Sequence, residues 1–398
     1  MKFIILNITR VKFLTVHVHS FYLFHIFFDM FTQVLMALPD KAVIGRALRR
    51  FRSKALNQGD DVLPPPPNDI TFQIPDRFTE LILFDSLTSD NDAQNRIIII
   101  GDPTLVGGLH RSALWLADGT FKKVPNLFFQ LYTIHFELGS GIHPAGLYCL
   151  LPNKTEATYQ RLFTQVVNLL PNSRPDVILT DFEMAAISAF RCHFPNSKVT
   201  GCYFHLTPSV LRKVGEIGMR PSYYTDEEIR GMVRCLAALA HVPVDDIVSS
   251  FEALAAEMPQ HSSMDELLSY FEHTYIRGRR MPGRGDNYRP ALFPPQTWNQ
   301  RESAAEGIAR TTNIVEGWHF SLHSLFLCDH PSMWFFLEGL AKDIASQKAC
   351  FLQGIAGGER PVRKSYMLLK KRVQRSMDMY NQTDIITYLR AIAHLTIA

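Results

Sequence analysis

The segment Ala113-Leu-Trp-Leu-Ala-Asp-Gly-Thr-Phe121 combines an apolar run over residues 113–117 with an abrupt stop at Asp118 and Gly119. A short apolar run that is bounded by turn residues is typical of a buried strand. The same pattern returns in Val177-Ile-Leu-Thr-Asp-Phe-Glu183, where the apolar run stops at Asp181. We therefore predict two buried strands, each of which ends at an aspartate.

Strand and helix patterns continue on both sides of this segment. Gly139-Ser-Gly141 separates two β-rich stretches and is typical of a hairpin. Thr155 is placed to cap a helix with one apolar stripe, and a second, short helix is expected from Glu183 to about Phe194. The expected strands cover residues 81–84, 97–100, 113–117, 128–136, 142–151, 177–180 and 198–204. From Asp118 onwards the order is strand, strand, strand, helix, strand, helix, strand, which predicts an α/β fold with a mixed sheet and helices packed on it.

The patterns divide the chain into four regions. Residues 1–67 comprise an atypical apolar leader, a short basic helix and a Pro-rich linker, and residues 68–205 hold the first part of the α/β core. Residues 206–300 contain three amphipathic stripes that would bury their apolar faces on one another, which predicts an all-helical insertion. Residues 301–398 complete the core with a helix that opens near Asn313 and with further C-terminal helices.

The leader contains a stretch, residues 13–28, that resembles a membrane segment. His17, His19, Ser20 and His25 interrupt it and Asp29 ends it, whereas a span needs about 20 predominantly apolar residues. No small-x-small cleavage site follows. A degenerate or misassigned leader is therefore favoured over an anchor, and a membrane partner is not expected.

Charge and cysteine content exclude several classes of protein. The 398 residues carry 41 Lys and Arg against 38 Asp and Glu, a net charge of +3, so the chain is no polycation and any affinity for nucleic acid must come from local patches. The Gly-rich basic loop with Arg277, Arg279, Arg280 and Arg284 is the candidate DNA contact. Six cysteines without a CxxC pair argue against a disulfide scaffold and favour a reducing compartment.

Three acids, Asp118, Asp181 and Glu316, are candidate catalytic residues and metal ligands. With the strand between them in the predicted order, the two aspartates are expected side by side at the edge of the sheet, and Glu316 can reach across from a late helix. Mg²⁺ prefers oxygen ligands, and two such ions about 3.5–4 Å apart stabilise both the attacking and the leaving oxygen of a phosphoryl displacement. Because Asp-Gly is also common in ordinary turns, the pattern alone leaves a purely structural role open.

From Ile74 to about His323 the chain resembles the transposase domain of Mutator-like elements (MULEs). The resemblance rests on several motifs in the order of that family, of which any single one would be weak. They are Ala117-Asp-Gly-Thr-Phe-Lys122 with Val124-Pro125, Phe129-Gln-Leu-Tyr-Thr-Ile-His135, Thr180-Asp-Phe-Glu183, Gly201-Cys-Tyr-Phe-His205, Phe293-Pro-Pro-x-x-Trp-Asn299 and Thr312-Asn-x-x-Glu-Gly-Trp-His319.

The resemblance implies an RNase H-like core in βββαβαβ order, with a helical insertion before the last catalytic helix. Residue by residue, it makes Asp118, Asp181 and Glu316 the DDE acids, which would hold two Mg²⁺ or Mn²⁺ ions. The implied activity is metal-dependent DNA strand cleavage and strand transfer in the nucleus. The implied partners are the ends of the element, the target DNA and further copies of the chain bound to DNA.

Accessory residues follow from the same motifs. Cys202 and His205 have half the ligands of a structural zinc site, and positions i and i+3 point to opposite faces of a straight strand, so structural zinc is not expected. We expect Cys202 in the core and His205 at the start of a helix near the acids. His319 shares one helix face with Glu316 and is a further candidate.

Two rival interpretations stay open. Relatives commonly carry an upstream Cys/His finger that reads the element ends, and no such pattern precedes Asp118. A domesticated, catalytically silent DNA- or chromatin-binding descendant is therefore the main alternative. A membrane-anchored protein of unrelated function, based on residues 1–38 alone, is the other.

Overall fold

The computed structural model describes residues 63–89, 94–139, 141–281, 288–302, 313–358 and 364–396. The predicted leader, the basic helix after it and Arg284 lie outside these residues. The chain divides into two compact units, Met1–Pro64 and Pro65–Ala398, and the described helices and strands all belong to the second. None of these helices is both long and apolar enough to cross a bilayer.

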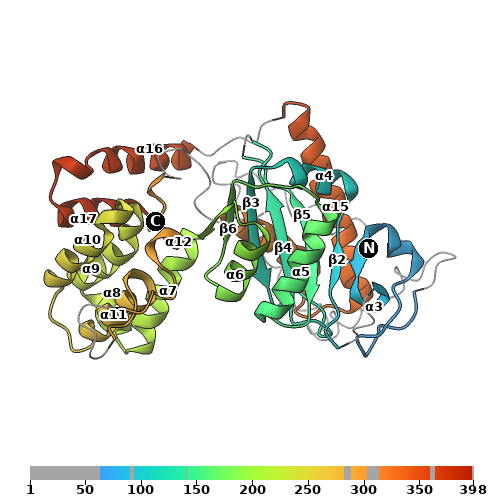
Figure 1. Cartoon of the computed structure of the whole chain (residues 1–398), viewed down its shortest axis with the longest axis horizontal. Coiled ribbons are helices and arrows are strands. Elements are labelled where there is room, and N and C mark those ends of the chain that lie inside the picture. The colour runs from blue at the N-terminus through green and yellow to red at the C-terminus, as the bar shows by residue number, and fades with distance from the viewer. Residues whose placement is uncertain are drawn as a thin grey trace, which may run out of the picture. The chain divides into compact units, whose positions relative to one another are not determined.

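One mixed sheet forms the centre of the α/β part (Figure 1). Its described strands are β1 (Ile82–Asp85), β2 (Ile98–Ile100), β3 (Leu114–Thr120), β4 (Gln130–Phe136), β5 (Ala145–Leu151), β6 (Val177–Thr180) and β7 (Lys198–Gly201), in the order β1-β2-β5-β4-β3-β6-β7. β4 pairs antiparallel with both β3 and β5, whereas β6 pairs parallel with β3 and with β7. The carboxyl ends of β3, β5, β6 and β7 therefore meet at one edge of the sheet.

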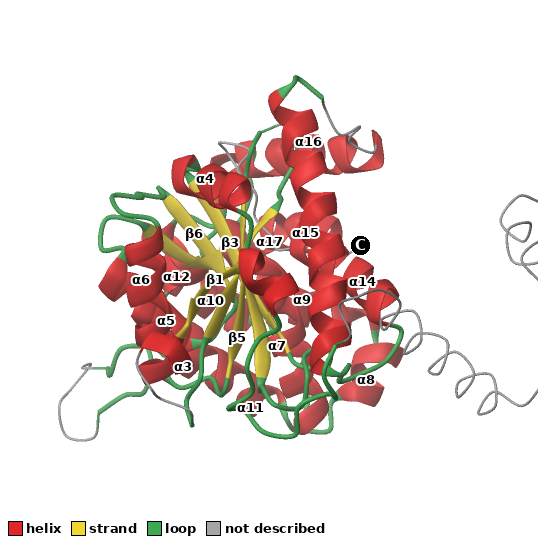
Figure 2. Cartoon of the chain, turned by 90° about the vertical axis from the view of Figure 1, so that its right-hand side faces the viewer, coloured by secondary structure: helices red, strands yellow, loops and turns green. Residues whose placement is uncertain are grey.

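Helices cover both faces of this sheet, which explains why its central strands are apolar throughout instead of alternating. α5 (Glu156–Leu169) and α6 (Met184–His193) lie on one side of the strands, and α14 (Asn313–Phe326) and α15 (Met333–Ile355) lie on the other (Figure 2). α4 (Pro103–Arg111) packs against β5 and α15. The approach is so close that a Cβ on Gly108 would lie within 2.7 Å of ring atoms of Phe136 and Phe351.

The predicted order of elements from Asp118 onwards is confirmed, as is a mixed sheet with helices packed on it. The predicted turn is also confirmed, since Gly139 and Gly141 have φ values of 93° and 72° and Gly139 pairs with Ile142. The prediction that Asp118 ends its strand is wrong, because β3 continues its pairing with β4 as far as Thr120. The last predicted strand is too long and ends at Gly201.

α4 was not predicted, although the sequence carries its start signals. Asp102 precedes the helix and its carboxylate accepts a hydrogen bond from the Thr104 N–H at 2.8 Å, while Pro103 occupies the first helical position. Both residue types are favoured at these places. Short helical segments elsewhere are η1 (Asp76–Leu81), α3 (Ser86–Ser89), η2 (Leu239–His241), η3 (Val244–Asp246), the π-turn η4 (Glu272–Ile276) and η5 (Tyr380–Gln382).

A second group of helices packs largely on itself (Figure 1). It comprises α7 (Tyr203–Glu216), α8 (Arg220–Thr225), α9 (Glu227–Ala238), α10 (Ile247–Ala256), α11 (Met264–Phe271), α12 (Pro295–Trp298), α16 (Lys364–Asp378) and α17 (Ile385–Thr396). The predicted apolar stripes bury Met232 of α9, Phe251 of α10 and Leu267 of α11. α17 packs against α9 and α10, so this helical group combines residues of the predicted insertion with the C-terminal region.

The segment around Trp298 joins the helical group to the sheet. The buried Trp298 indole donates hydrogen bonds to the Tyr275 and Phe293 carbonyls at 2.9 and 3.0 Å. Next to it, the Gln300 amide donates to the Gly201 carbonyl of β7 at 3.1 Å, and the Thr200 hydroxyl donates to the Thr297 carbonyl at 3.0 Å. The Phe-Pro-Pro-x-x-Trp-Asn motif therefore attaches the helical group to the end of β7.

His135 on β4 makes the stability of the fold sensitive to acid. Its ring is fully buried against Trp318, with ring centroids 5.0 Å apart. Burial, together with the charges of His319 and His143, lowers the pKa of His135 from 6.5 to about 3. Between these two values the unfolded chain binds more protons than the folded chain, so stability falls as the pH falls through that window.

We expect His135→Phe to resist acid better than the wild type. One pKa unit corresponds to about 1.4 kcal/mol, so His135 should account for a loss of about 2 kcal/mol in the free energy of unfolding between pH 7 and pH 5. Phenylalanine keeps an aromatic ring against Trp318 and does not titrate. Urea unfolding of both proteins at the two pH values measures the difference, and equal losses would show that His135 does not contribute.

Candidate active site

Asp118 lies in β3, and Asp181 directly follows the adjacent parallel strand β6. Leu116 of β3 pairs with Leu179 of β6, and each aspartate comes two residues after this pair. The two aspartates were expected side by side, and β3, which carries Asp118, pairs directly with β6, which Asp181 follows. Both acids belong to the carboxyl edge of the sheet, where α/β folds place their sites.

The buried phenol of Tyr132 lies close to both carboxylates. Burial raises the pKa of Tyr132 well above its usual value, and the charges of Tyr159, Asp181 and Asp118 raise it further. The Tyr132 hydroxyl is also 3.3 Å from the Thr180 hydroxyl. Two hydrogen bonds orient the carboxylates themselves. The Gly119 N–H donates to Asp118 Oδ1 at 2.8 Å, and the Thr180 hydroxyl donates to Asp181 Oδ1 at 3.4 Å.

Glu183 is an acid of this site that our sequence analysis did not select, although it stands in the Thr180-Asp-Phe-Glu183 motif. Burial and the charge of Asp181 raise the pKa of Glu183, which places the two carboxylates near each other. The Tyr159 hydroxyl donates to Glu183 Oε2 at 3.2 Å and accepts a hydrogen bond from the Gln130 amide at 2.8 Å. Burial raises the pKa of Asp181 as well, against the opposing charge of Lys154.

Phe182, between the two acids, anchors this turn to the helical group. Its ring packs edge-to-face on Tyr275 and Phe293, with centroid distances of 5.9 and 5.1 Å. A Cβ at Gly201 would clash with the Phe182 ring, so only glycine fits at the end of β7. The alternation Asp-Phe-Glu thus directs the aromatic ring into the helical group and holds the acids at the edge of the sheet.

α14 packs against β3, the strand that carries Asp118. His319 Nδ1 lies 3.7 Å from Asp118 Oδ2, and Glu316 precedes His319 by three residues in the same helix. The side chain of Glu316 lies outside the described part of the structure.

Asp343 of α15 holds α14 in this position. Its Oδ2 accepts hydrogen bonds from the Trp318 indole at 2.8 Å and from the Tyr148 hydroxyl of β5 at 2.6 Å. The Trp318 ring packs in turn on His135. One carboxylate therefore ties together a strand and two helices next to the acids.

His319 is neutral at physiological pH. Burial lowers its pKa to about 4, and the charges of His323 and His205 contribute to this shift. Its contact with Asp118 is therefore not an ion pair at pH 7. The effect of the His205 charge on the pKa of His319 indicates that His205, in the first turn of α7, lies near α14. Cys202 is buried and precedes α7, with its N–H donating to the Thr180 carbonyl at 2.7 Å.

The predicted basic loop is only partly available for DNA. Arg277 forms ion pairs with Glu252 and Glu272 at 2.7 and 2.6 Å, which balance its charge. Arg279 and Arg280 are exposed, and Arg280 pairs with Tyr288 through a single β-bridge. Sequence reasoning does not detect the pairing of Arg277, because its partners lie in other helical segments.

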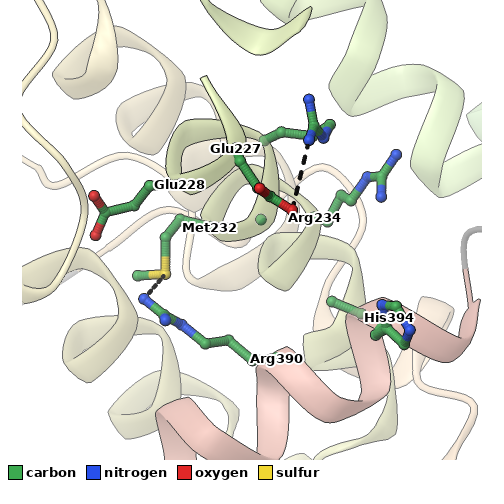
Figure 3. Close-up of a pocket in the computed structure, with 9 residues that line it drawn as sticks. Glu227, Glu228, Met232, Arg234, Arg390 and His394 are labelled. Carbon is green, nitrogen blue, oxygen red and sulfur yellow. Dashed lines mark hydrogen bonds and ion pairs between the residues drawn. The ribbon is translucent and has the colours of Figure 1, made fainter. Parts of the chain in front are cut away.

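A pocket of about 430 Å³ opens between α9 and α17, and none of the predicted acids lines it (Figure 3). Arg230, Arg234, Arg390 and His394 line it together with Glu227 and Glu228. The Arg390 guanidinium contacts Met232 Sδ at 3.4 Å, and Arg230 lies 3.9 Å from Glu227. Because charges of both signs alternate along its wall, this pocket does not define a site for one class of ligand.

The acids at the sheet edge suit a hard divalent cation. Asp118 and Asp181 offer carboxylate oxygens, which Mg²⁺ and Mn²⁺ prefer, and a cation would offset the cost of the buried charge that raises the pKa of Asp181. Among the side chains that the structure describes, which exclude Glu316, no three His, Cys, Asp or Glu residues form a group able to hold a metal.

The strand that carries Asp118 and the strand that precedes Asp181 both lie in a segment that matches a known family. Specifically, residues 114–209 match the family model described as the MULE transposase domain. The match begins with β3 and ends within α7, so it contains Asp118, Asp181 and His205, whereas Glu316 and His319 lie beyond it. It confirms the resemblance seen in the motifs for this part of the chain. No curated protein matches the chain.

Proposed function

We propose that the chain is a transposase-like enzyme that cleaves and transfers DNA strands in a metal-dependent reaction, with Asp118, Asp181 and Glu316 as its acids. The observation that carries the proposal is the register of β3 and β6, in which Leu116 pairs with Leu179, two residues before Asp118 and Asp181, inside the matched segment. The contact between His319 and Asp118 supports Glu316 as the third acid, since it directs this face of α14 to the site.

The strand order supports an RNase H-like core within the larger sheet. β5, β4 and β3 are antiparallel neighbours, and β6 and β7 continue the sheet in parallel on the side of β3. Helices α7 to α12 of the helical group follow β7 and precede α14, which supports an insertion before the proposed catalytic helix, whereas α16 and α17 come later in the chain. In this interpretation β1 and β2 are an extension next to β5.

The roles of the residues follow from their positions. Asp118 and Asp181 would hold two Mg²⁺ or Mn²⁺ ions together with Glu316, and such a pair of ions stabilises the attacking and leaving oxygens of a phosphodiester. The Gly119 N–H and the Thr180 hydroxyl orient the two aspartates. Because His319 is neutral, its contact with Asp118 leaves the negative charge of the carboxylate available to a metal ion.

A transposase domain implies DNA as the partner in general. We extend this to the ends of an element and a target duplex, to action in the nucleus and to an assembly of several copies on DNA. The exposed Arg279 and Arg280 are the part of the predicted basic loop that could follow a phosphate backbone.

Removal of the metal tests the proposal most directly. We expect the purified chain to convert supercoiled plasmid into nicked circles with Mn²⁺ or Mg²⁺, and to lose this activity completely in EDTA. An Asp118→Asn protein purified in parallel controls for contaminating nuclease. Binding of plasmid without nicking in either metal would refute the enzymatic proposal and would support a catalytically silent DNA-binding protein.

A further inference from the structure

Two exposed phenylalanines lie at the same sheet edge as the acids. Phe121 directly follows β3, three residues after Asp118, and Phe129 directly precedes β4. Their side chains are 42% and 45% exposed and pack edge-to-face with ring centroids 5.4 Å apart. The burial of aromatic rings is strongly favourable. A pair of rings that stays exposed to solvent beside a candidate active site therefore indicates a ligand-binding surface.

The loop that joins the two rings is fixed in place. The buried Lys123 ammonium contacts Asp329 Oδ1 at 2.9 Å and the Cys328 carbonyl at 2.8 Å. The Lys122 carbonyl accepts a hydrogen bond from the His330 N–H at 2.8 Å, and the Phe129 N–H donates to the Leu151 carbonyl at 2.9 Å. A surface that is already ordered loses little conformational entropy when a ligand binds.

A cation lies beside the Phe121 ring. Lys154, exposed after the end of β5, has its Nζ 5.9 Å from the centre of the Phe121 ring. Its positive charge opposes the rise in pKa that burial causes at Asp181 and Glu183. This edge of the sheet thus combines an aromatic face, an ammonium group and the acids.

We propose that Phe121 and Phe129 form a stacking surface for an unpaired DNA base next to the scissile phosphate, and that Lys154 contacts the backbone phosphate of that nucleotide. The inference rests on the proposed function, since it names the form of DNA that the site takes. An aromatic face beside a cation matches a nucleotide, which offers a flat base and a phosphate. A paired base is already stacked on its neighbours, so the surface selects DNA that is locally unpaired.

The test compares two duplexes of equal length and charge, one fully paired and one with a short run of central mismatches, bound in EDTA and followed by fluorescence anisotropy. Stacking on an aromatic side chain is worth about tenfold in affinity per base. The wild type should therefore bind the mismatched duplex about tenfold more tightly. Phe121→Leu should lose this preference and keep its affinity for the paired duplex, whereas Phe121→Trp should keep the preference.

Other variants separate stacking from charge and from folding. Lys154→Gln should weaken the binding of both duplexes. It should also reduce the slope of log affinity against log salt concentration by about one. Tyr224→Ala, which removes a 68% exposed aromatic ring from α8, is the matched control and should leave the preference unchanged. If Phe121→Leu does not fold by circular dichroism, Phe129→Leu replaces it.

The possible outcomes distinguish this inference from the proposed function. A wild type without preference for the mismatched duplex, or a Phe121→Leu protein that retains it, overturns the stacking surface even if nicking is normal. A preference that depends on Phe121 in a protein that nicks no DNA upholds the surface and refutes the catalysis.

Discussion

Asp118→Asn and Asp181→Asn are each expected to lower the rate of metal-dependent plasmid nicking about a thousandfold, which corresponds to about 4 kcal/mol in the barrier. Asparagine keeps the shape of the side chain and the acceptor oxygen that Gly119 or Thr180 contacts. It removes the negative charge that a divalent ion requires. Time courses of nicking in Mn²⁺ measure the rates.

The same variants should be as stable as the wild type. Burial raises the pKa of Asp181, so its charge is costly in the folded state without metal, and Asp181→Asn should unfold at an equal or higher temperature. A lower activity could then not be attributed to loss of the fold. Thermal unfolding in EDTA measures this directly.

If Asp118 and Asp181 act together in one site, the loss of either aspartate already removes the contribution of both to the nicking rate. The double variant should therefore nick no more slowly than either single variant. Glu316→Gln should match them if it is the third acid. Asp265→Asn, at an exposed position in the first turn of α11, is the matched control and should nick at the wild-type rate. A single variant that nicks as fast as the wild type would refute the assignment of that residue.

Local signals in the sequence were sufficient for the strands and for the two aspartates. The apolar runs before Asp118 and Asp181 predict buried strands because the sheet is covered on both faces. The pairing of β3 with β6 depends on the whole topology of the sheet and not on a local signal. The end of β3 was misplaced because pairing with β4 overrides the turn preference of Asp-Gly.

Features that depend on distant partners could not be predicted. The Tyr159 contact with Glu183 joins a helix to the turn after β6, and Arg277 finds Glu252 across the helical group. The exposure of Phe121 could not be predicted either, because the hydrophobicity of phenylalanine predicts burial whereas the structure leaves the ring exposed. Such departures from the general rule are where function is best sought.

The largest effect on stability is expected at the other end of the sheet, where Arg96 is buried beside β1 and β2. Its Nε donates to Asp85 Oδ1 at 2.8 Å, and its Nη1 donates to the carbonyls of Ile70 and Phe72 at 2.6 and 2.8 Å. The guanidinium also lies over the Phe72 ring, 4.3 Å from its centre. This ion pair joins the two outer strands to the segment that precedes them.

Asp85→Ala should lower the free energy of unfolding by about 3–5 kcal/mol, because it leaves the Arg96 guanidinium buried without its counter-ion. Removal of both charges, in Asp85→Leu with Arg96→Met, should restore most of this loss, since two apolar side chains can replace a buried ion pair. Glu266→Ala, which breaks the more exposed pair with Lys213, should cost at most about 1 kcal/mol. Urea unfolding measures all three, and hydrogen exchange in β1 and β2 should rise in Asp85→Ala alone. If Asp85→Ala costs no more than Glu266→Ala, Arg96 has found water or another partner and the ion pair does not hold this edge of the sheet.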